Sequence, residues 1–166
     1  MKRSLVMFVV MIIGIAAAAS PAAELALRIG DLMPSHTLAA LTGPAVTIPD
    51  DVRGKVTVVH FWTDSCGSCR EEMPALDRLY AQYARKGLTI VAVNVGQSKP
   101  EVQKFVDTFR VSYPVLLDAG KESTRRYCVA GVPRTYILDR SGTIRYKILG
   151  EATEETLKKM IVSMLH

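Results

Sequence analysis

Cysteine and histidine are scarce in this sequence, and their scarcity excludes two ways of stabilising a fold. The 166 residues include three of each. Three cysteines are too few for a disulfide framework, and a chain of this length does not need one. A structural zinc site needs four ligands, usually as two Cys/His pairs. Cys128 stands alone and the histidines are not spaced as ligands, so we expect no metal site and no bound cofactor.

A basic stripe interleaved with aromatic residues is also missing, so we expect no nucleic-acid partner. The formal net charge is +5. Of the 21 Lys and Arg residues, Lys2 and Arg3 belong to the N-terminal segment, which leaves 19 against 16 acidic residues. Apolar residues make up 49% and charged residues 22%, a balance that favours a folded core over disorder. The length suits one domain with a tail.

Residues 1–23 have the layout of a secretory signal peptide: a basic start, an apolar run at residues 5–19, then small residues and a proline. The apolar run is short for a membrane span, which needs about 20 residues. An uncleaved membrane anchor is the alternative. Either interpretation places residues 24–166 outside the cytoplasm, in the periplasm or tethered to the inner membrane.

The pattern of residues 24–166 predicts one α/β domain whose sheet is covered on both faces. Residues 55–62 and 88–95 are apolar, β-branched runs typical of buried strands. Between them the apolar spacing predicts a helix over residues 66–85, kinked by Pro74 and ended by Gly87. A strand, a helix and a strand in this order imply a parallel pair with a right-handed crossover.

The other expected elements are shorter. Two strands flank a Gly-Pro turn in residues 36–50. A helix begins after Ser98 and runs to about Arg110. A strand at 113–118, a short helix at 121–127 and a strand ending at 139 follow. A turn at 141–142 leads to a strand at 143–149, and a final helix is capped by Thr153.

The stretch TDSCGSCREEMP, from Thr63 to Pro74, carries two cysteines three positions apart. Closing so small a loop stabilises a fold only weakly, so a redox-active disulfide explains the pair better than a structural one. Cys66 begins the predicted helix, where unpaired N–H groups and the helix dipole favour a thiolate. Cys69 lies one turn further on, close enough to bridge. We expect Cys66 to attack and the more buried Cys69 to resolve the mixed disulfide.

Several motifs occur together in a specific order: VVHFWTDSCGSCREEMPAL, TIVAVNVGQS, YPVLLD, GVPRTYILDRSG and ILGEATEETLKKMI. Across about residues 30–165 the chain resembles the TlpA/ResA-like branch of the thioredoxin superfamily. Members are extracytoplasmic thiol–disulfide oxidoreductases, and several act in cytochrome c maturation. The resemblance implies a thioredoxin-like α/β fold, with a mixed central sheet flanked by helices and an N-terminal β-hairpin extension.

The resemblance also implies that the protein reduces protein disulfides, with apocytochrome c as a candidate substrate and a membrane thiol reductase as electron donor. Other functions stay open. The same dithiol could serve an oxidase, and a redox-switched binding module would not need turnover. A peroxiredoxin-like peroxidase could use Cys66, because Thr63 to Cys66 forms a T-x-x-C motif, although Val59 stands where that motif has proline.

Three further residues take roles from the resemblance. Pro133 matches a cis-proline facing the cysteines, which would turn the Val132 backbone toward an extended substrate; an ordinary strand-starting proline is the alternative. Glu72 matches an acidic residue beneath the site. A partly buried carboxylate there would have a raised pKa and could exchange a proton with Cys69. The alternative is a simple helix-starting acid, and Glu71 should face solvent.

The sequence departs from the family pattern at several positions. His60 replaces a buried aspartate, so it is either a proton relay or a satisfied core residue. Ser65 and Arg134 lie beside the expected substrate groove, and Arg134 either favours an acidic partner or points to solvent. Cys128 is expected to be a buried inert thiol, with a third redox thiol as the alternative.

Overall fold

A seven-stranded mixed sheet forms the centre of the domain in the computed structural model, which describes residues 27–166. The predicted signal peptide at residues 1–23 lies outside the described residues. The strands are β1 (His36–Ala40), β2 (Val46–Ile48), β3 (Val56–Trp62), β4 (Leu88–Val95), β5 (Val115–Asp118), β6 (Arg134–Leu138) and β7 (Ile144–Leu149). Their order across the sheet is β2-β1-β5-β4-β3-β6-β7.

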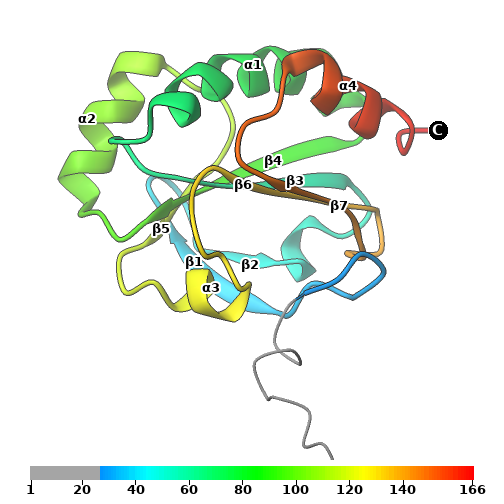
Figure 1. Cartoon of the computed structure of the whole chain (residues 1–166), viewed down its shortest axis with the longest axis horizontal. Helices are drawn as coiled ribbons and strands as arrows, with labels where there is room; N and C mark the ends of the chain where they lie inside the picture. Colours follow the sequence, from blue (N-terminus) through cyan, green and yellow to red (C-terminus); the bar gives the residue numbers. More distant parts are fainter. Residues whose placement is uncertain (1–26) are drawn as a thin grey trace, which may run out of the picture.

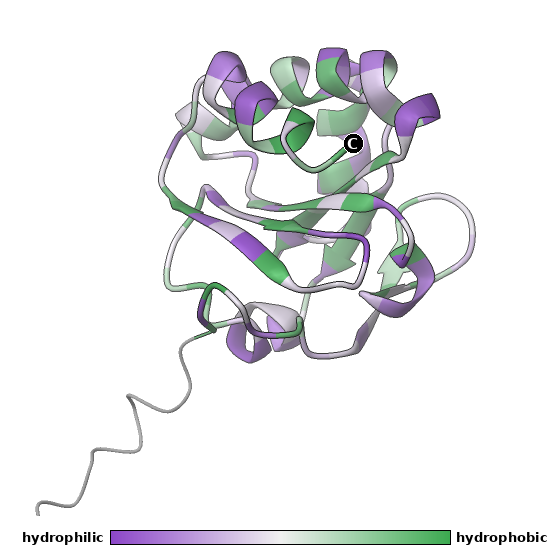
Figure 2. Ribbon diagram, turned by 90° about the vertical axis from the view of Figure 1, so that its right-hand side faces the viewer, coloured by the Kyte–Doolittle hydropathy of each residue, from purple (hydrophilic) through white to green (hydrophobic). Residues whose placement is uncertain are grey.

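Helices cover both faces of this sheet, as the sequence predicts. The α-helices are α1 (Gly67–Tyr83), α2 (Lys99–Phe109), α3 (Glu122–Arg126) and α4 (Glu154–Val162), and two 3₁₀ turns are η2 (Asp50–Val52) and η3 (Ala84–Lys86). Figure 1 shows α1, α2 and α4 above the sheet, with α3 below it. Hydrophobic residues gather along the strands between these layers, whereas the outer turns of the helices are largely hydrophilic (Figure 2).

The central strands β3 and β4 are parallel, with Val56 opposite Leu88 and Trp62 opposite Asn94. Every residue of β3 is buried, which explains why its sequence is an unbroken apolar run and not an alternating one. The predicted parallel pair and the helix between its strands are therefore confirmed. On its other side β3 pairs antiparallel with β6, and Phe61 lies opposite Arg134.

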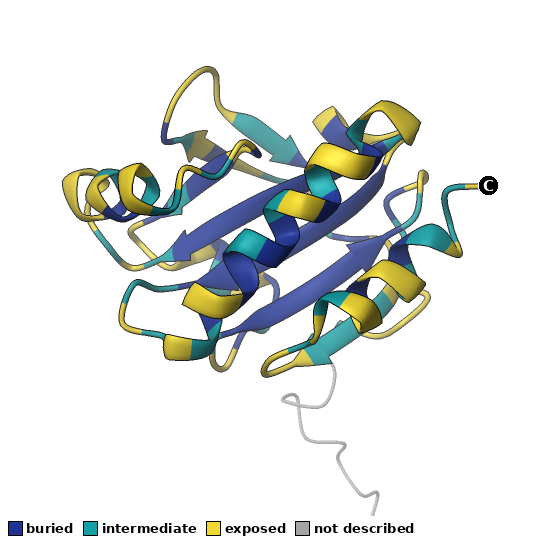
Figure 3. Cartoon of the chain, turned by 90° about the horizontal axis from the view of Figure 1, so that it is seen from above, coloured by how far each residue is buried: buried dark blue, intermediate teal, exposed yellow. Residues whose placement is uncertain are grey.

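Helix α1 crosses the sheet diagonally and buries one face against it (Figure 3). Met73, Leu76 and Leu79 are at most 1% exposed and belong to the hydrophobic core on the α1 face. Pro74 lies inside the helix, as expected. The following 3₁₀ turn ends at Gly87, whose φ of 98° is in the left-handed region that glycine adopts most readily.

The shorter predicted elements are also present. β1 and β2 form an antiparallel pair, and β1 joins the main sheet by pairing with β5. This is the predicted N-terminal hairpin extension. Ser98 and Glu101 form a capping box at the start of α2, and the Thr153 hydroxyl accepts the Thr156 N–H at the start of α4. Hydrogen bonds to otherwise unsatisfied N–H groups explain why both helices begin there.

The first described residues enter the domain beside β7 and below the sheet. Gly30 N donates to Ile144 O at 2.8 Å, and Ile144 N donates to Asp31 O at 2.9 Å. Leu27 and Met33 pack into the second hydrophobic core, on the face of the sheet opposite α1. Over residues 27–166, no helix is long and apolar enough to cross a membrane.

Candidate active site

The two segments predicted to form the site lie at the same end of two neighbouring strands. β3 ends at Trp62, and its antiparallel neighbour β6 begins at Arg134. Because Phe61 is paired with Arg134, the residues that follow β3 and those that precede β6 lie at one end of the sheet. The pairing therefore brings the loop that contains Cys66 close to Val132 and Pro133.

Cys66 and Cys69 form a disulfide at the N-terminus of α1, with Cα atoms 5.2 Å apart. Cys66 is the N-cap residue, and its Sγ accepts the Cys69 N–H at 3.2 Å. A sulfur that accepts a helix N–H is in a position that favours negative charge. Cys66 is half-buried, whereas Cys69 has no exposed surface. Cys66 is therefore the sulfur that a partner molecule can reach.

The loop before Cys66 is fixed by side chains that the sequence analysis did not single out. Gln97 Oε1 accepts the Asp64 N–H at 2.9 Å and an Asn94 side-chain N–H at 2.8 Å. Arg70 Nε donates to the Asp64 carbonyl oxygen at 2.7 Å. Gln97 follows β4, the parallel neighbour of β3, so its place at the carboxyl end of these strands is the signal that could have identified it.

The Val132–Pro133 peptide bond is cis. Val132 is half-buried and packs, like Cys66, against the core on the α1 face. The Pro133 carbonyl oxygen accepts the Gly150 N–H at 3.0 Å, which ties this segment to the loop after β7. A groove of about 200 Å³ runs beside it and is bordered by Leu149, whose side chain is 68% exposed. The site thus has a partly apolar surface next to the cis bond.

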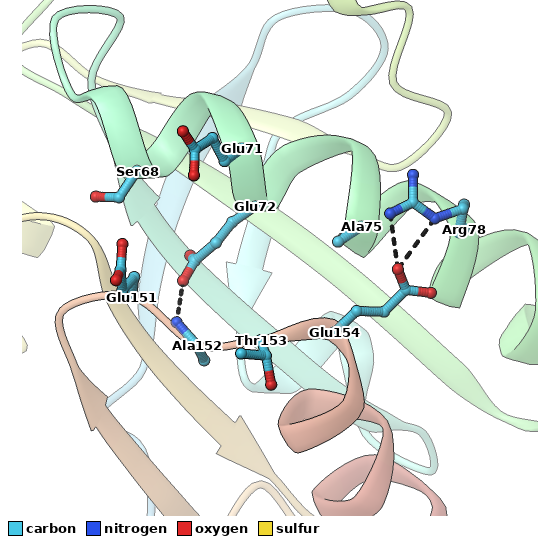
Figure 4. A pocket seen from close by; sticks show the side chains of 9 residues that line it. All are labelled: Ser68, Glu71, Glu72, Ala75, Arg78, Glu151, Ala152, Thr153 and Glu154. Atoms are coloured by element: carbon cyan, nitrogen blue, oxygen red, sulfur yellow. Dashed lines mark hydrogen bonds and ion pairs between the residues drawn. The ribbon is translucent and has the colours of Figure 1, made fainter.

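Glu72 lies below the disulfide on α1 and is 5% exposed. Its Oε1 accepts the Ala152 N–H from the loop between β7 and α4 (Figure 4). Burial raises the pKa of Glu72, the Ala152 N–H opposes that rise, and the Glu151 carboxylate adds to it. A carboxylate whose pKa is raised is a better proton acceptor than an ordinary one.

The other acidic residues near Glu72 line a groove of about 450 Å³ (Figure 4). Glu71 is exposed, as expected. Glu151 also borders the groove, and Glu154 is held by Arg78 in an ion pair of 2.7 Å. The two glutamates that follow the cysteines therefore have different environments: one faces solvent and the other lies beneath the site.

His60 is fully buried on β3. Its Nδ1 lies 2.9 Å from Thr135 Oγ1 and 3.6 Å from Glu72 Oε2, while Nε2 has no hydrogen-bond partner in the described part of the chain. Burial lowers the pKa of His60 to about 4, so the ring is neutral at physiological pH. The structure thus places the His60 ring beside the Glu72 carboxylate, on the face of the sheet against which Cys69 also packs.

The structure excludes one of the two alternatives for Arg134, and Cys128 is less buried than expected. Arg134 does not point to solvent: it is 7% exposed, and its guanidinium lies 5.8 Å from the centre of the Tyr136 ring. Alternation along β6 explains this, because Arg134 and Tyr136 share one face of the strand. Cys128 is half-buried instead of buried. It has a φ of 54° and lies outside the Cys66–Cys69 disulfide.

Within residues 27–166, no group of three or more His, Cys, Asp and Glu side chains is placed to hold a metal ion. The chemistry that the described geometry supports rests on the Cys66–Cys69 pair at the start of α1. One reachable sulfur begins a helix, a second sulfur is buried next to it, and a carboxyl group with a raised pKa lies one turn below. This arrangement can pass two electrons between a dithiol and a disulfide.

Comparisons with known proteins agree with this chemistry. The Redoxin family model matches residues 28–161. The chain is 33% identical over 139 residues to the thiol-disulfide oxidoreductase ResA of Geobacillus thermodenitrificans, a match that covers 84% of this chain and 79% of the relative. It is 34% identical over 141 residues to the thioredoxin-like protein YneN of Bacillus subtilis, covering 83% and 81% of the two chains.

Solved structures agree as well. A crystal structure from Chlorobium tepidum, assigned as a thiol:disulfide interchange protein DsbE, superimposes with a TM-score of 0.81 at 29% identity, covering 85% of this chain and all of the other. This match confirms the expected thioredoxin-like fold. From its sequence, its fold and the match over residues 28–161, the chain belongs to the Redoxin family, as a thiol–disulfide oxidoreductase of the ResA type.

Proposed function

We propose that this protein works outside the cytoplasm and reduces disulfide bonds in other proteins. The observation that carries the proposal is the disulfide at the start of α1, in which Cys66 is reachable and Cys69 is buried. The layout of residues 1–23 supports the location, because a basic start, an apolar run and small residues are typical of an export signal. Residues 24–166 then form the exported catalytic domain.

The reaction begins with the reduced protein. The Cys66 thiolate attacks one sulfur of the substrate disulfide, and the other substrate sulfur leaves as a thiolate. The Cys69 thiol then gives its proton to the Glu72 carboxylate, and the new thiolate attacks Cys66 Sγ. The Cys66–Cys69 disulfide forms, and the second substrate sulfur leaves as a thiolate that takes up a proton. Two electrons have passed from the protein to its substrate.

The segment around Pro133 is the proposed binding site for the substrate chain. The cis bond and the Gly150 N–H fix the Val132–Pro133 backbone beside the cysteines. An extended segment of the substrate can pair with the Val132 backbone, since main-chain hydrogen bonds of this kind bind strands of varied sequence. The exposed Leu149 side chain offers an apolar contact next to it.

The partners in this proposal come from the family resemblance. We infer that apocytochrome c is one substrate, which would place the protein in cytochrome c maturation, and that a membrane thiol reductase restores the dithiol. Both inferences depend on the direction of electron flow. Equilibration of the protein with mixtures of reduced and oxidised glutathione gives that direction. A strongly oxidising potential would overturn the reductase proposal and favour an oxidase.

The nucleophile and substrate can be tested together with Cys69→Ala. In this variant Cys66 still attacks, but the mixed disulfide cannot be resolved, so substrates should stay covalently attached and be identified by mass spectrometry. Cys66→Ala is the matched control and should capture nothing. Capture by Cys66→Ala and not by Cys69→Ala would reverse the two roles.

A further inference from the structure

The two carboxylate oxygens of Glu72 have different surroundings. Oε1 accepts the Ala152 N–H, whereas Oε2 faces the imidazole of His60, 3.6 Å from Nδ1. An oxygen that accepts an N–H is better suited to be the carbonyl oxygen of a carboxylic acid than its hydroxyl. A proton received by Glu72 therefore belongs on Oε2, the oxygen beside His60.

The surroundings of His60 also decide which ring nitrogen carries its proton. A neutral imidazole has one N–H and one bare nitrogen. Nε2 is buried without a hydrogen-bond partner among residues 27–166, and a buried N–H without an acceptor is costly. Nδ1 has two oxygens near it, Thr135 Oγ1 at 2.9 Å and Glu72 Oε2 at 3.6 Å. The proton therefore belongs on Nδ1, where it can be donated.

We propose that His60 is a positioning residue for the proton acceptor Glu72: its neutral Nδ1–H, shared with Thr135, favours the Glu72 carboxylate that receives the Cys69 proton. The inference rests on the proposed function of Glu72. The 3.6 Å separation in the oxidised protein is longer than a hydrogen bond, so a small approach of the ring would complete the contact. A neutral donor stabilises the carboxylate without adding a second buried charge.

Few other groups act on this pair. Glu72 and Cys69 come from α1, and Glu151, in the loop before α4, disfavours the Glu72 carboxylate by repulsion. On the sheet, β6 contributes the Thr135 hydroxyl and β4 places Ala92 opposite His60, and neither of these titrates. Within the described residues, the donors near the carboxylate are the Ala152 N–H and the His60 Nδ1–H. Loss of the His60 Nδ1–H should therefore change the pKa of Glu72 measurably.

The test measures the attack of Cys69 on the mixed disulfide separately from the first attack by Cys66. The reduced protein is mixed with oxidised glutathione, samples are acid-quenched, and mass spectrometry records the rise and decay of the Cys66–glutathione mixed disulfide as a function of pH. In the proposed mechanism the decay requires the Glu72 carboxylate, which receives the Cys69 proton, so the midpoint that depends on Glu72 reports the pKa of that carboxyl group. In His60→Leu, without the donor, we expect this midpoint to rise by about one pH unit, which slows resolution about tenfold below the midpoint.

His60→Asn is the matched control, because its amide N–H reaches about the place of Nδ1 but does not titrate. Its midpoint should equal that of the wild type. A midpoint unchanged in His60→Leu, or raised equally in both variants, overturns the proposal. If His60→Leu does not fold, Thr135→Val replaces it. The Nδ1–H then has only Glu72 as acceptor, so the midpoint should fall, and a midpoint that stays or rises is contrary to the proposal.

Glu72→Gln separates this inference from the function on which it rests. If Glu72 accepts the Cys69 proton, its replacement by glutamine removes the midpoint. A Glu72→Gln profile that keeps the wild-type midpoint overturns both the role of Glu72 and that of His60. A profile that loses the midpoint, together with an unchanged midpoint in His60→Leu, overturns only the role of His60.

Discussion

Acid should destabilise the folded protein through His60, and the size of the effect follows from its burial. The side chain is fully buried, and burial lowers its pKa from 6.5 to about 4. The unfolded chain therefore binds a proton at a higher pH than the folded chain does. The contribution is fully present above pH 6.5 and is lost as the pH falls through about 4. Since one pKa unit corresponds to about 1.4 kcal/mol, the loss by pH 4 is about 3 kcal/mol.

The contribution of Glu72 to stability depends on pH in the opposite direction, so Glu72 must be removed from the comparison. Burial raises its pKa, so its contribution is present at low pH and is lost as the pH rises through its folded value. The measurement is therefore made in Glu72→Gln, which keeps an oxygen for the Ala152 N–H. The free energy of unfolding in urea is compared for Glu72→Gln and for Glu72→Gln with His60→Leu, at about pH 7.5 and about pH 4.

The double variant should lose about 3 kcal/mol less than Glu72→Gln between the two pH values. The double variant also loses the hydrogen bond between His60 and Thr135. The free energy of that bond does not depend on pH, so it cancels when the values at the two pH values are subtracted. Other carboxyl groups titrate in the same range, but they are common to both proteins. An equal dependence on pH in the two proteins would refute the reasoning, because it would mean that the folded protein protonates His60 as easily as the unfolded chain.

Three further predictions concern stability and the loop before Cys66. The Tyr136 hydroxyl donates to the buried Tyr127 carbonyl oxygen at 2.6 Å. Tyr136→Phe should therefore lower the free energy of unfolding in urea by about 1–2 kcal/mol. An unchanged urea midpoint would mean that water replaces the donor. Gln97→Ala leaves the Asp64 N–H without its acceptor, so glutathione-disulfide turnover should slow with little loss of stability; unchanged turnover would show that the loop needs no such anchor. Leu76→Ala in the α1 core should cost about 2–5 kcal/mol in the same urea assay, unless the site collapses around the smaller side chain.

Local patterns were enough to predict most of the fold. The buried strands are continuous apolar runs, and the helices have capping residues such as Ser98 and Thr153 that satisfy their first N–H groups. These features act over a few residues, so the sequence displays them directly. The order of the strands and the cis geometry at Pro133 are not local, and they became predictable only through the resemblance to a known family.

The contacts beneath the disulfide could not be predicted in this way. Glu72 meets Ala152, 80 positions away, and His60 meets Thr135, 75 positions away. Nothing in the sequence near His60 indicates that its ring faces a carboxylate, because only the packing of α1 over β3 and β6 brings them together. The second cis bond, Ile48–Pro49, was missed for a related reason: a proline at the end of a short strand is compatible with either isomer.

The place where the chain enters the domain has a consequence for an anchored form of the protein. Leu27 and Met33 pack on the face of the sheet opposite α1, while Cys66 and Cys69 belong to the α1 face. A membrane anchor that precedes Leu27 would therefore join the domain on the face of the sheet opposite α1. Cys66 and Cys69 would then lie on the other face of the sheet from that point of attachment.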